Sequence, residues 1–182
     1  MLTLALDTAT PDLSLALLTP EGTFSYCERL ERLHAQRIAP EVQNLFSTAG
    51  LPFKADRLVV GVGPGSYTGV RVAASYALGL ARAWGAEVLG LSTLMAMAAS
   101  HEGKIGVTLD ARRGNVYAAL YEIKAGEILQ TLIPEGKYPL ADFAAQVEAA
   151  GGQILSDARV SGEMLGKLAD QHGIQDWKLH YL

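Results

Sequence analysis

The 182-residue chain is 49% hydrophobic, which is enough to bury a real core in one large domain or two small lobes. Its 15 basic and 19 acidic side chains give a formal net charge of −4, unlike a protein that grips a nucleic-acid backbone by itself. The single cysteine excludes an internal disulfide, and no uncharged stretch of about 18 residues could span a membrane. The start lacks a basic leader, so we expect a cytoplasmic protein with no membrane partner.

Three short apolar or alternating segments, separated by turn signals, open the chain and predict a β-meander: 3–9, 12–18 and 22–30. The next segments predict a helix, a buried strand, a helix, a strand and a short helix: 34–50, 57–63, 70–84, 86–92 and 93–100. The pattern then restarts with three strands, a helix, a short strand and a helix: 104–111, 115–123, 127–133, 140–152, 153–156 and 161–173.

The restart repeats the opening segment at an offset of 110 − 7 = 103 residues, which aligns Asp7 with Asp110 and several apolar positions around them. A chance likeness of two hairpins is the alternative. Two lobes that each open with a β-meander, with an aspartate at its first turn, describe the actin-like ATPase (ribonuclease H-like) fold. We therefore predict this α/β fold, with an N-terminal lobe over residues 1–100 and a smaller, shortened C-terminal lobe over residues 101–182.

A glycine-rich loop, GVGPGSYTGVR at 61–71, joins a predicted strand to a predicted helix. It is not a P-loop, because Val70 and Arg71 follow its last glycine, and its spacing fits neither the dinucleotide fingerprint nor the nucleophile elbow. It either caps the helix through Ser66 or Thr68, or contacts an anion or a partner. Arg71 lies in the first turn, where the helix dipole disfavours a cation, so we expect an anionic group beside it. The candidate loop residues are Gly63, Pro64, Gly65, Ser66, Thr68, Gly69 and Arg71.

The motifs DTAT at 7–10, GPGSYTGVR at 63–71 and LDARRGNVY at 109–117 together resemble the TsaB (YeaZ) family. The resemblance implies a non-catalytic subunit that pairs with TsaD, its catalytic paralogue, and with the ATPase TsaE. Together they support threonylcarbamoyl transfer to the adenosine next to the tRNA anticodon. We expect no cofactor of the chain's own, ATP or ADP only at the interface between subunits, and tRNA contact only through the complex.

A metal site is not expected, because the pair of histidines four residues apart in TsaD-like proteins is reduced here to His34 with Ile38. Asp7, Thr8 and Asp110 are candidate cleft residues. The two aspartates either order water or magnesium or simply cap their turns. Asp157-Ala158-Arg159 stands where actin-like ATPases have a glycine pair behind the adenine, which weakens the case for tight ATP binding.

The predicted helix 70–84 is apolar nearly all round and so needs cover on two sides. The preceding helix can supply one cover and a partner subunit the other. The predicted subunit interface comprises Ile38, Val42, Phe46, Ala73, Ala74, Ala77, Leu80 and Ala81. Without its partner, the same face is expected to form a homodimer.

Two other functions stay open from the sequence. An autonomous actin-like ATPase or kinase would use Asp7 and Asp110 around magnesium. A serine hydrolase would use Ser66 as its nucleophile, although no histidine lies within sequence reach to act as its base.

Overall fold

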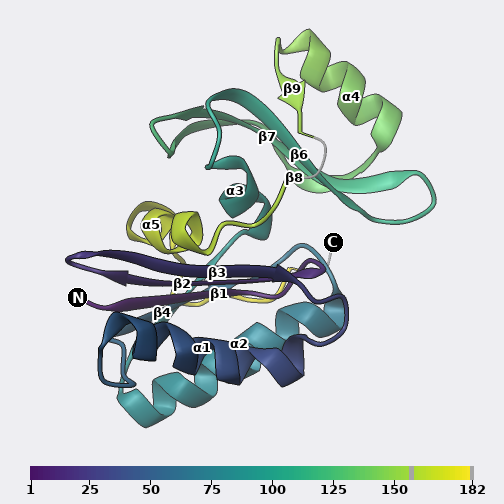
Figure 1. Ribbon diagram of the computed structural model, residues 1–182. Helices are drawn as coiled ribbons and strands as arrows, with labels where there is room; N and C mark the ends of the chain where they lie inside the picture. The colour runs from purple at the N-terminus through teal and green to yellow at the C-terminus, as the bar shows by residue number, and fades with distance from the viewer. Residues whose placement is uncertain (156–157, 181–182) are drawn as a thin grey trace.

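Two β-sheets, one in each lobe, organise the chain in the computed structural model, which describes residues 1–155 and 158–180 (Figure 1). The first sheet has the order β3-β2-β1-β4-β5, with β1 (Thr3–Asp7), β2 (Asp12–Thr19), β3 (Gly22–Arg29), β4 (Arg57–Gly61) and β5 (Glu87–Leu91). The second has the order β8-β7-β6-β9, with β6 (Gly103–Asp110), β7 (Asn115–Lys124), β8 (Glu127–Pro139) and β9 (Gln153–Ile154).

Four strands of the first sheet share the topology of the second sheet, as the sequence repeat predicts, and β5 extends the first sheet by one strand. In each, the first three strands form an antiparallel meander and the fourth pairs in parallel with the first. Asp7 and Asp110 occupy matching places, at the end of the first strand of each meander. The predicted α/β architecture, with two sheets that each open with a β-meander, is therefore confirmed.

Within the described residues, five helices cover the sheets: α1 (His34–Ala49), α2 (Tyr67–Trp84), α3 (Thr93–Ala98), α4 (Leu140–Ala149) and α5 (Gly162–His172). Figure 1 shows α1 and α2 on the outer face of the first sheet, α3 and α5 between the sheets, and α4 on the far side of the second sheet. Strands β1 and β4 are buried along their whole length, because helices cover both faces of their sheet. Three apolar clusters fill the resulting layers.

The chain returns to the first lobe after β9. Helix α5 packs against the first sheet, and a Cβ on Gly162 would lie 2.7 Å from the carbonyl carbon of Leu15. Beyond α5, Ile174 forms a β-bridge with Gly90, and the His180 amide donates to the Val62 carbonyl at 2.8 Å. The range 101–182 predicted for the C-terminal lobe thus contains the second sheet together with a helix and a tail that pack on the first.

Many element boundaries differ from the sequence predictions by one to three residues, and the end of β8 differs by six. Helix α2 begins at Tyr67, three residues before the predicted start, because the Ser66 side chain caps it by accepting from the Gly69 amide at 3.2 Å. Strand β8 continues to Pro139, six residues past its predicted end, through several register shifts in its pairing with β7. In the described part of the chain, no helix combines the length and apolar character needed to cross a membrane.

Candidate functional site

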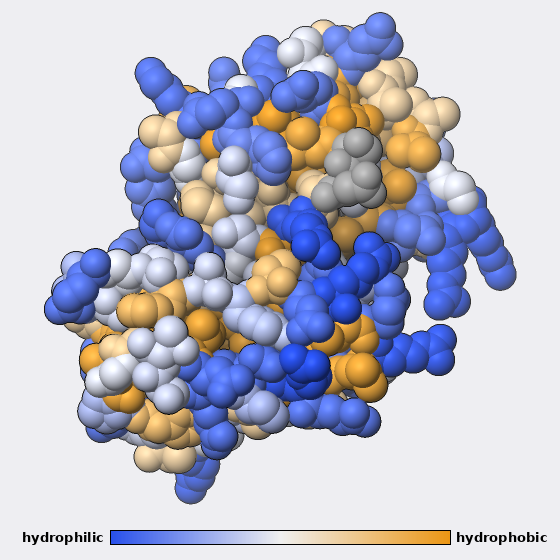
Figure 2. All heavy atoms as spheres, in the orientation of Figure 1, coloured by the Kyte–Doolittle hydropathy of each residue, from blue (hydrophilic) through white to orange (hydrophobic). Residues whose placement is uncertain are grey.

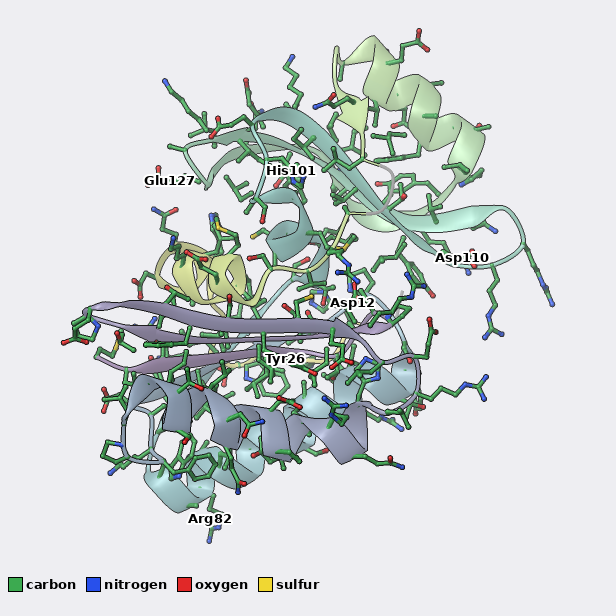
Figure 3. The ribbon with its side chains drawn as sticks, in the orientation of Figure 1. Asp12, Tyr26, Arg82, His101, Asp110 and Glu127 are labelled. Atoms are coloured by element: carbon green, nitrogen blue, oxygen red, sulfur yellow. The ribbon has the colours of Figure 1, made fainter. Side chains whose placement is uncertain are left out.

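A cavity of about 510 Å³ lies where the two lobes meet, and the three sequence motifs converge on it. Its walls are the β1–β2 turn at 9–11, the end of the glycine loop with the first turn of α2 at 65–68, and the β6–β7 turn at 109–112 with Tyr117. Figure 3 shows Asp12 and Asp110 on the two sides of this junction. We call this space the junction cavity.

Asp7 does not line the junction cavity but is fully buried beneath it. One carboxylate oxygen accepts from the Ala9 amide and the other from the Thr93 hydroxyl, both at 2.7 Å. Burial raises the pKa of Asp7 to about 6, although these two hydrogen bonds act in the opposite direction. A Cβ on Gly61 would lie 1.7 Å from Asp7 Oδ2, so no space for a metal or water exists on that side. The prediction of Asp7 as a cleft residue is wrong, because packing seals its carboxylate inside the first lobe.

Thr8 is also fully buried, and it anchors α2 rather than facing the cavity. Its hydroxyl donates to the Gly69 carbonyl at 2.6 Å and accepts from the Ala73 amide at 3.0 Å. The Gly69 carbonyl and the Ala73 amide are four residues apart, which is the spacing of a backbone hydrogen bond in a regular α-helix. The side chain therefore fastens the first turn of α2 to the end of β1, and the prediction of Thr8 as a cleft residue is also wrong.

The glycine loop is held at both ends by backbone contacts. The Ser66 amide donates to the Ala9 carbonyl at 2.7 Å, and Gly63 and Thr93 form a backbone hydrogen bond of 2.9 Å. A Cβ on Gly65 would lie 2.3 Å from the Ala9 oxygen, and one on Gly69 would lie 2.0 Å from the Thr8 oxygen. These glycines are needed because the DTAT turn lies directly against the loop. Pro64 follows a cis peptide bond and is buried.

Asp110 is exposed and lines the junction cavity. Its side chain accepts from the Arg112 amide at 2.8 Å, an aspartate turn that directs the chain back into β7. Arg112 and Arg113 both have positive φ angles, 66° and 55°, within this turn. Asp7 and Asp110 thus match in the repeat but differ in environment, one sealed in the core and the other facing the cavity.

The geometry does not favour either of the two other functions, the autonomous ATPase or kinase and the serine hydrolase. An ATPase that coordinates magnesium through Asp7 and Asp110 would need both carboxylates at one cavity, whereas the oxygens of Asp7 are bonded inside the protein. Across residues 1–155 and 158–180, no three His, Cys, Asp or Glu side chains gather into a metal site. Ser66 caps α2, and within the same ranges no histidine is hydrogen-bonded to it. Asp157, which stands where actin-like ATPases have a glycine pair, lies outside the described residues.

Most of the predicted subunit interface is buried inside the chain itself. Helices α1 and α2 pack their apolar sides against the first sheet and each other, so these side chains are covered without a partner: Ile38, Val42, Phe46, Ala73, Ala74, Ala77 and Ala81. Leu80 is half-buried beside them. The interface prediction is corrected accordingly, because the alanines let α2 lie close to its own sheet rather than to another subunit.

The surface that α2 leaves exposed is a different stripe, which we call the outward stripe: Tyr67, Thr68, Arg71, Ser75, Leu78, Gly79, Arg82 and Ala83. Tyr67 and Leu78 are 55% and 51% exposed, and the Arg71 guanidinium lies 3.7 Å from the centre of the Tyr67 ring. Arg82 points away from both sheets in Figure 3. A groove of about 570 Å³ runs beside the stripe, between α2 and the start of α1.

Sequence reasoning missed several residues of the site. Thr93, which bonds both Asp7 and the glycine loop, is 86 residues from Asp7 and carries no local signal. Tyr117 and Arg112 belong to the motif at 109–117, but only the fold shows that they line the junction cavity. Tyr67 and Leu78 could have been found from their helical spacing once Ser66 fixes the helix start.

Comparisons with known proteins agree with this architecture. The family model of TsaD, tRNA N6-adenosine threonylcarbamoyltransferase, matches residues 27–161. A TsaB protein of Bacillus subtilis is 34% identical over 160 residues, which is 85% of this chain and 69% of that protein. A TsaB protein of Escherichia coli is 42% identical over 125 residues, which is 65% of this chain and 54% of that protein.

A solved structure titled YeaZ from Pseudomonas aeruginosa superposes with a TM-score of 0.83 at 30% identity, and the match covers 100% of this chain and 99% of that one. The superposition and the TsaD match confirm the predicted actin-like ATPase (ribonuclease H-like) fold. By motif, sequence and architecture alike, the chain belongs to the TsaB (YeaZ) family.

Proposed function

We propose that the chain is a non-catalytic subunit that pairs with TsaD and supports threonylcarbamoyl transfer to the adenosine next to the tRNA anticodon. Membership of the TsaB family supports a role in tRNA threonylcarbamoyladenosine biosynthesis, since the relatives carry that name. The Bacillus subtilis and Escherichia coli alignments span 69% and 54% of those proteins, so activity and partners come to this chain as proposals.

The outward stripe of α2 is the observation that carries the pairing with TsaD. It presents two half-exposed large side chains, Tyr67 and Leu78, beside the small Ser75 and Gly79. Small residues let a second helix approach closely, while the large ones can enter grooves on a partner. The groove beside the stripe, bordered by Val72 and Tyr76, offers a matching recess. This stripe, rather than the buried residues predicted from the sequence, is the surface that we propose contacts TsaD.

The position of the stripe depends on the motifs at the junction. Thr8 fixes the first turn of α2, and the Ser66 cap fixes where the helix begins. The glycine loop thereby sets the surface offered to TsaD. In this proposal ATP or ADP is held at the surface between the subunits, close to Arg71, and the chain has no cofactor of its own. TsaE joins the pair, and tRNA contact is made only through the complex. In the absence of TsaD, two copies pair through the same stripe.

Charge substitutions on the stripe test this proposal. Leu78→Arg should weaken TsaD binding about tenfold or more, because it places a charge in the centre of an apolar contact. Leu129→Arg is the matched control, since Leu129 is similarly exposed, at 56%, but lies on β8. Titration calorimetry with purified TsaD measures both. Equal binding by Leu78→Arg and the unsubstituted chain would show that TsaD contacts another surface.

A further inference from the structure

The junction cavity has an aromatic and cationic lining, and the part of it on the second lobe lies outside the outward stripe proposed to bind TsaD. Tyr117 lines the cavity from β7, and its register partner Lys137 on β8 places its ammonium 5.9 Å from the centre of the tyrosine ring. Tyr67 lines the opposite wall from α2, with Arg71 stacked on its ring. One tyrosine with an adjacent cation therefore borders the cavity from each lobe.

The local charge is opposite in sign to that of the whole chain. The net charge is −4, yet the β6–β7 turn brings Arg112 to the cavity wall and exposes Arg113 next to it. Lys137 is exposed on the neighbouring strand. Asp110 is the acidic residue on the wall, and it accepts a hydrogen bond from the turn itself. Figure 2 shows strongly hydrophilic residues gathered where the two lobes meet. The positive charges of Arg112, Arg113 and Lys137 are spread over an area suited to an anion larger than a single small ion.

Polar groups complete the wall on the first lobe. Ser66 and Thr68 line the cavity at the first turn of α2, and Thr10 lines it from the β1–β2 turn. The first amide groups of a helix have no carbonyl partner within the helix, and its dipole favours negative charge there. A phosphate at this wall would lie in the same cavity that Arg112 lines from the second lobe.

We infer that the junction cavity binds a nucleotide unit of single-stranded RNA, with its base stacked on Tyr117 and its phosphates beside Arg112 and Arg113. Aromatic platforms next to cations are the usual means of binding single strands. A magnesium-bound triphosphate fits less well, because Asp7 is sealed in the core and, among the carboxylates of the described residues, Asp110 is the one that lines the cavity. The cations stand on the rim, where a strand would continue. The inference deepens the proposed role in tRNA modification and rests on it for the choice of RNA.

The test is fluorescence anisotropy of a labelled single-stranded RNA heptamer with the full chain over a series of salt concentrations. About three neutralised phosphates should give a slope of about −2 in log affinity against log salt. Arg112→Ala with Arg113→Ala should reduce the slope to about −0.7 and weaken binding at least about tenfold at low salt. The matched control, Lys54→Ala with Lys124→Ala, removes two exposed cations outside the cavity and should leave the slope unchanged.

Substitutions at Tyr117 provide a second test, because they change base stacking without changing the charge of the cavity. Tyr117→Leu should weaken the heptamer about tenfold with an unchanged salt slope, whereas Tyr117→Phe should bind like the unsubstituted chain. AMP and magnesium-ATP serve as competitors. Equal loss in the lysine control, or displacement of the heptamer by magnesium-ATP at stoichiometric concentration, would overturn the inference. The pairing proposal is judged separately, since Tyr117→Leu should still bind TsaD; if the heptamer does not bind while TsaD does, only the RNA site is wrong.

Discussion

Thr93 and Asp7 are joined by a 2.7 Å hydrogen bond across 86 residues of sequence, and the same threonine oxygen accepts from the Gly63 amide at 3.2 Å. The carboxylate that opens the first sequence motif is thus connected to the glycine loop through one hydroxyl group. Because Asp7 is fully buried and its oxygens are engaged, its role is to hold the loop rather than to meet a ligand.

Asp7 should make stability depend on pH. Burial raises its pKa from 3.8 to about 6, so the folded chain binds more protons than the unfolded chain between these values. The free energy of unfolding contributed by this group therefore falls as pH rises through that window and stays low above it. Asp7→Asn cannot ionise, so the variant should gain up to about 3 kcal/mol relative to the unsubstituted chain between about pH 4 and pH 7. Urea unfolding at several pH values measures this difference, and parallel profiles for the two proteins would contradict it.

Two glycines of α2 should respond oppositely to alanine. A Cβ on Gly69 would lie 2.0 Å from the Thr8 carbonyl oxygen, so Gly69→Ala must push the β1–β2 turn away and should cost about 2 kcal/mol or more. Gly79 is exposed in the middle of the same helix with nothing within 4 Å, so Gly79→Ala should stabilise by about 0.5 to 1 kcal/mol. Thermal unfolding distinguishes the two, and a Gly69→Ala variant as stable as Gly79→Ala would refute the close contact.

Thr8 should be replaceable only by a residue that keeps the hydroxyl. Thr8→Val has nearly the same shape but leaves the Gly69 carbonyl and the Ala73 amide without their buried partner, at a cost of about 1 to 3 kcal/mol. Thr8→Ser retains the hydroxyl and should lose less. Hydrogen exchange at the Ala73 amide, followed by NMR, reports the local effect. Slow exchange there in Thr8→Val would mean that the helix closes its own hydrogen bond and needs no anchor.

The tail should detach when Gly90 gains a side chain. A Cβ at this position would lie 2.4 Å from Trp177 Cβ, and Gly90 also forms the β-bridge with Ile174. Gly90→Ala should therefore raise hydrogen exchange along 173–180 and at the His180 amide, which donates to Val62. Gly79→Ala is the control, because a Cβ on that glycine would meet open space. Gly151→Ala is less suitable, because Gly151 has a positive φ that alanine would strain. Unchanged exchange in the tail of Gly90→Ala would show that the tail is held by other contacts.

The fold could be predicted from the sequence to the level of its elements because local patterns specify them. The alternating segments at 12–18 and 115–123 and the Ser66 cap have signals within a few residues, and the Asp7–Asp110 offset revealed the repeated meander. The site could be predicted only in part. The burial of a side chain depends on residues that are distant in the sequence and pack against it. The sequence near Asp7 and near the alanines of α2 therefore did not indicate that these side chains are buried. Likewise, no sequence pattern placed Tyr117 opposite Tyr67.

The pairing proposal leads to a direct functional test of the outward stripe. In the presence of TsaD, TsaE, threonylcarbamoyl-adenylate and tRNA, the unsubstituted chain should support formation of threonylcarbamoyladenosine. Leu78→Arg should lower the rate, and an excess of the variant should restore part of it, since the defect lies in binding. Leu129→Arg should support the full rate. A Leu78→Arg defect that persists at saturation would instead assign the stripe a role after assembly.

The measurement that tests the account most directly is that reconstituted reaction with and without the chain, scored by mass spectrometry of the nucleosides released from the tRNA. The account predicts abundant threonylcarbamoyladenosine when the chain is present and little or none when it is left out. It also predicts that the chain without TsaD modifies no tRNA. Equal modification with and without the chain would contradict the account, and so would modification by the chain alone.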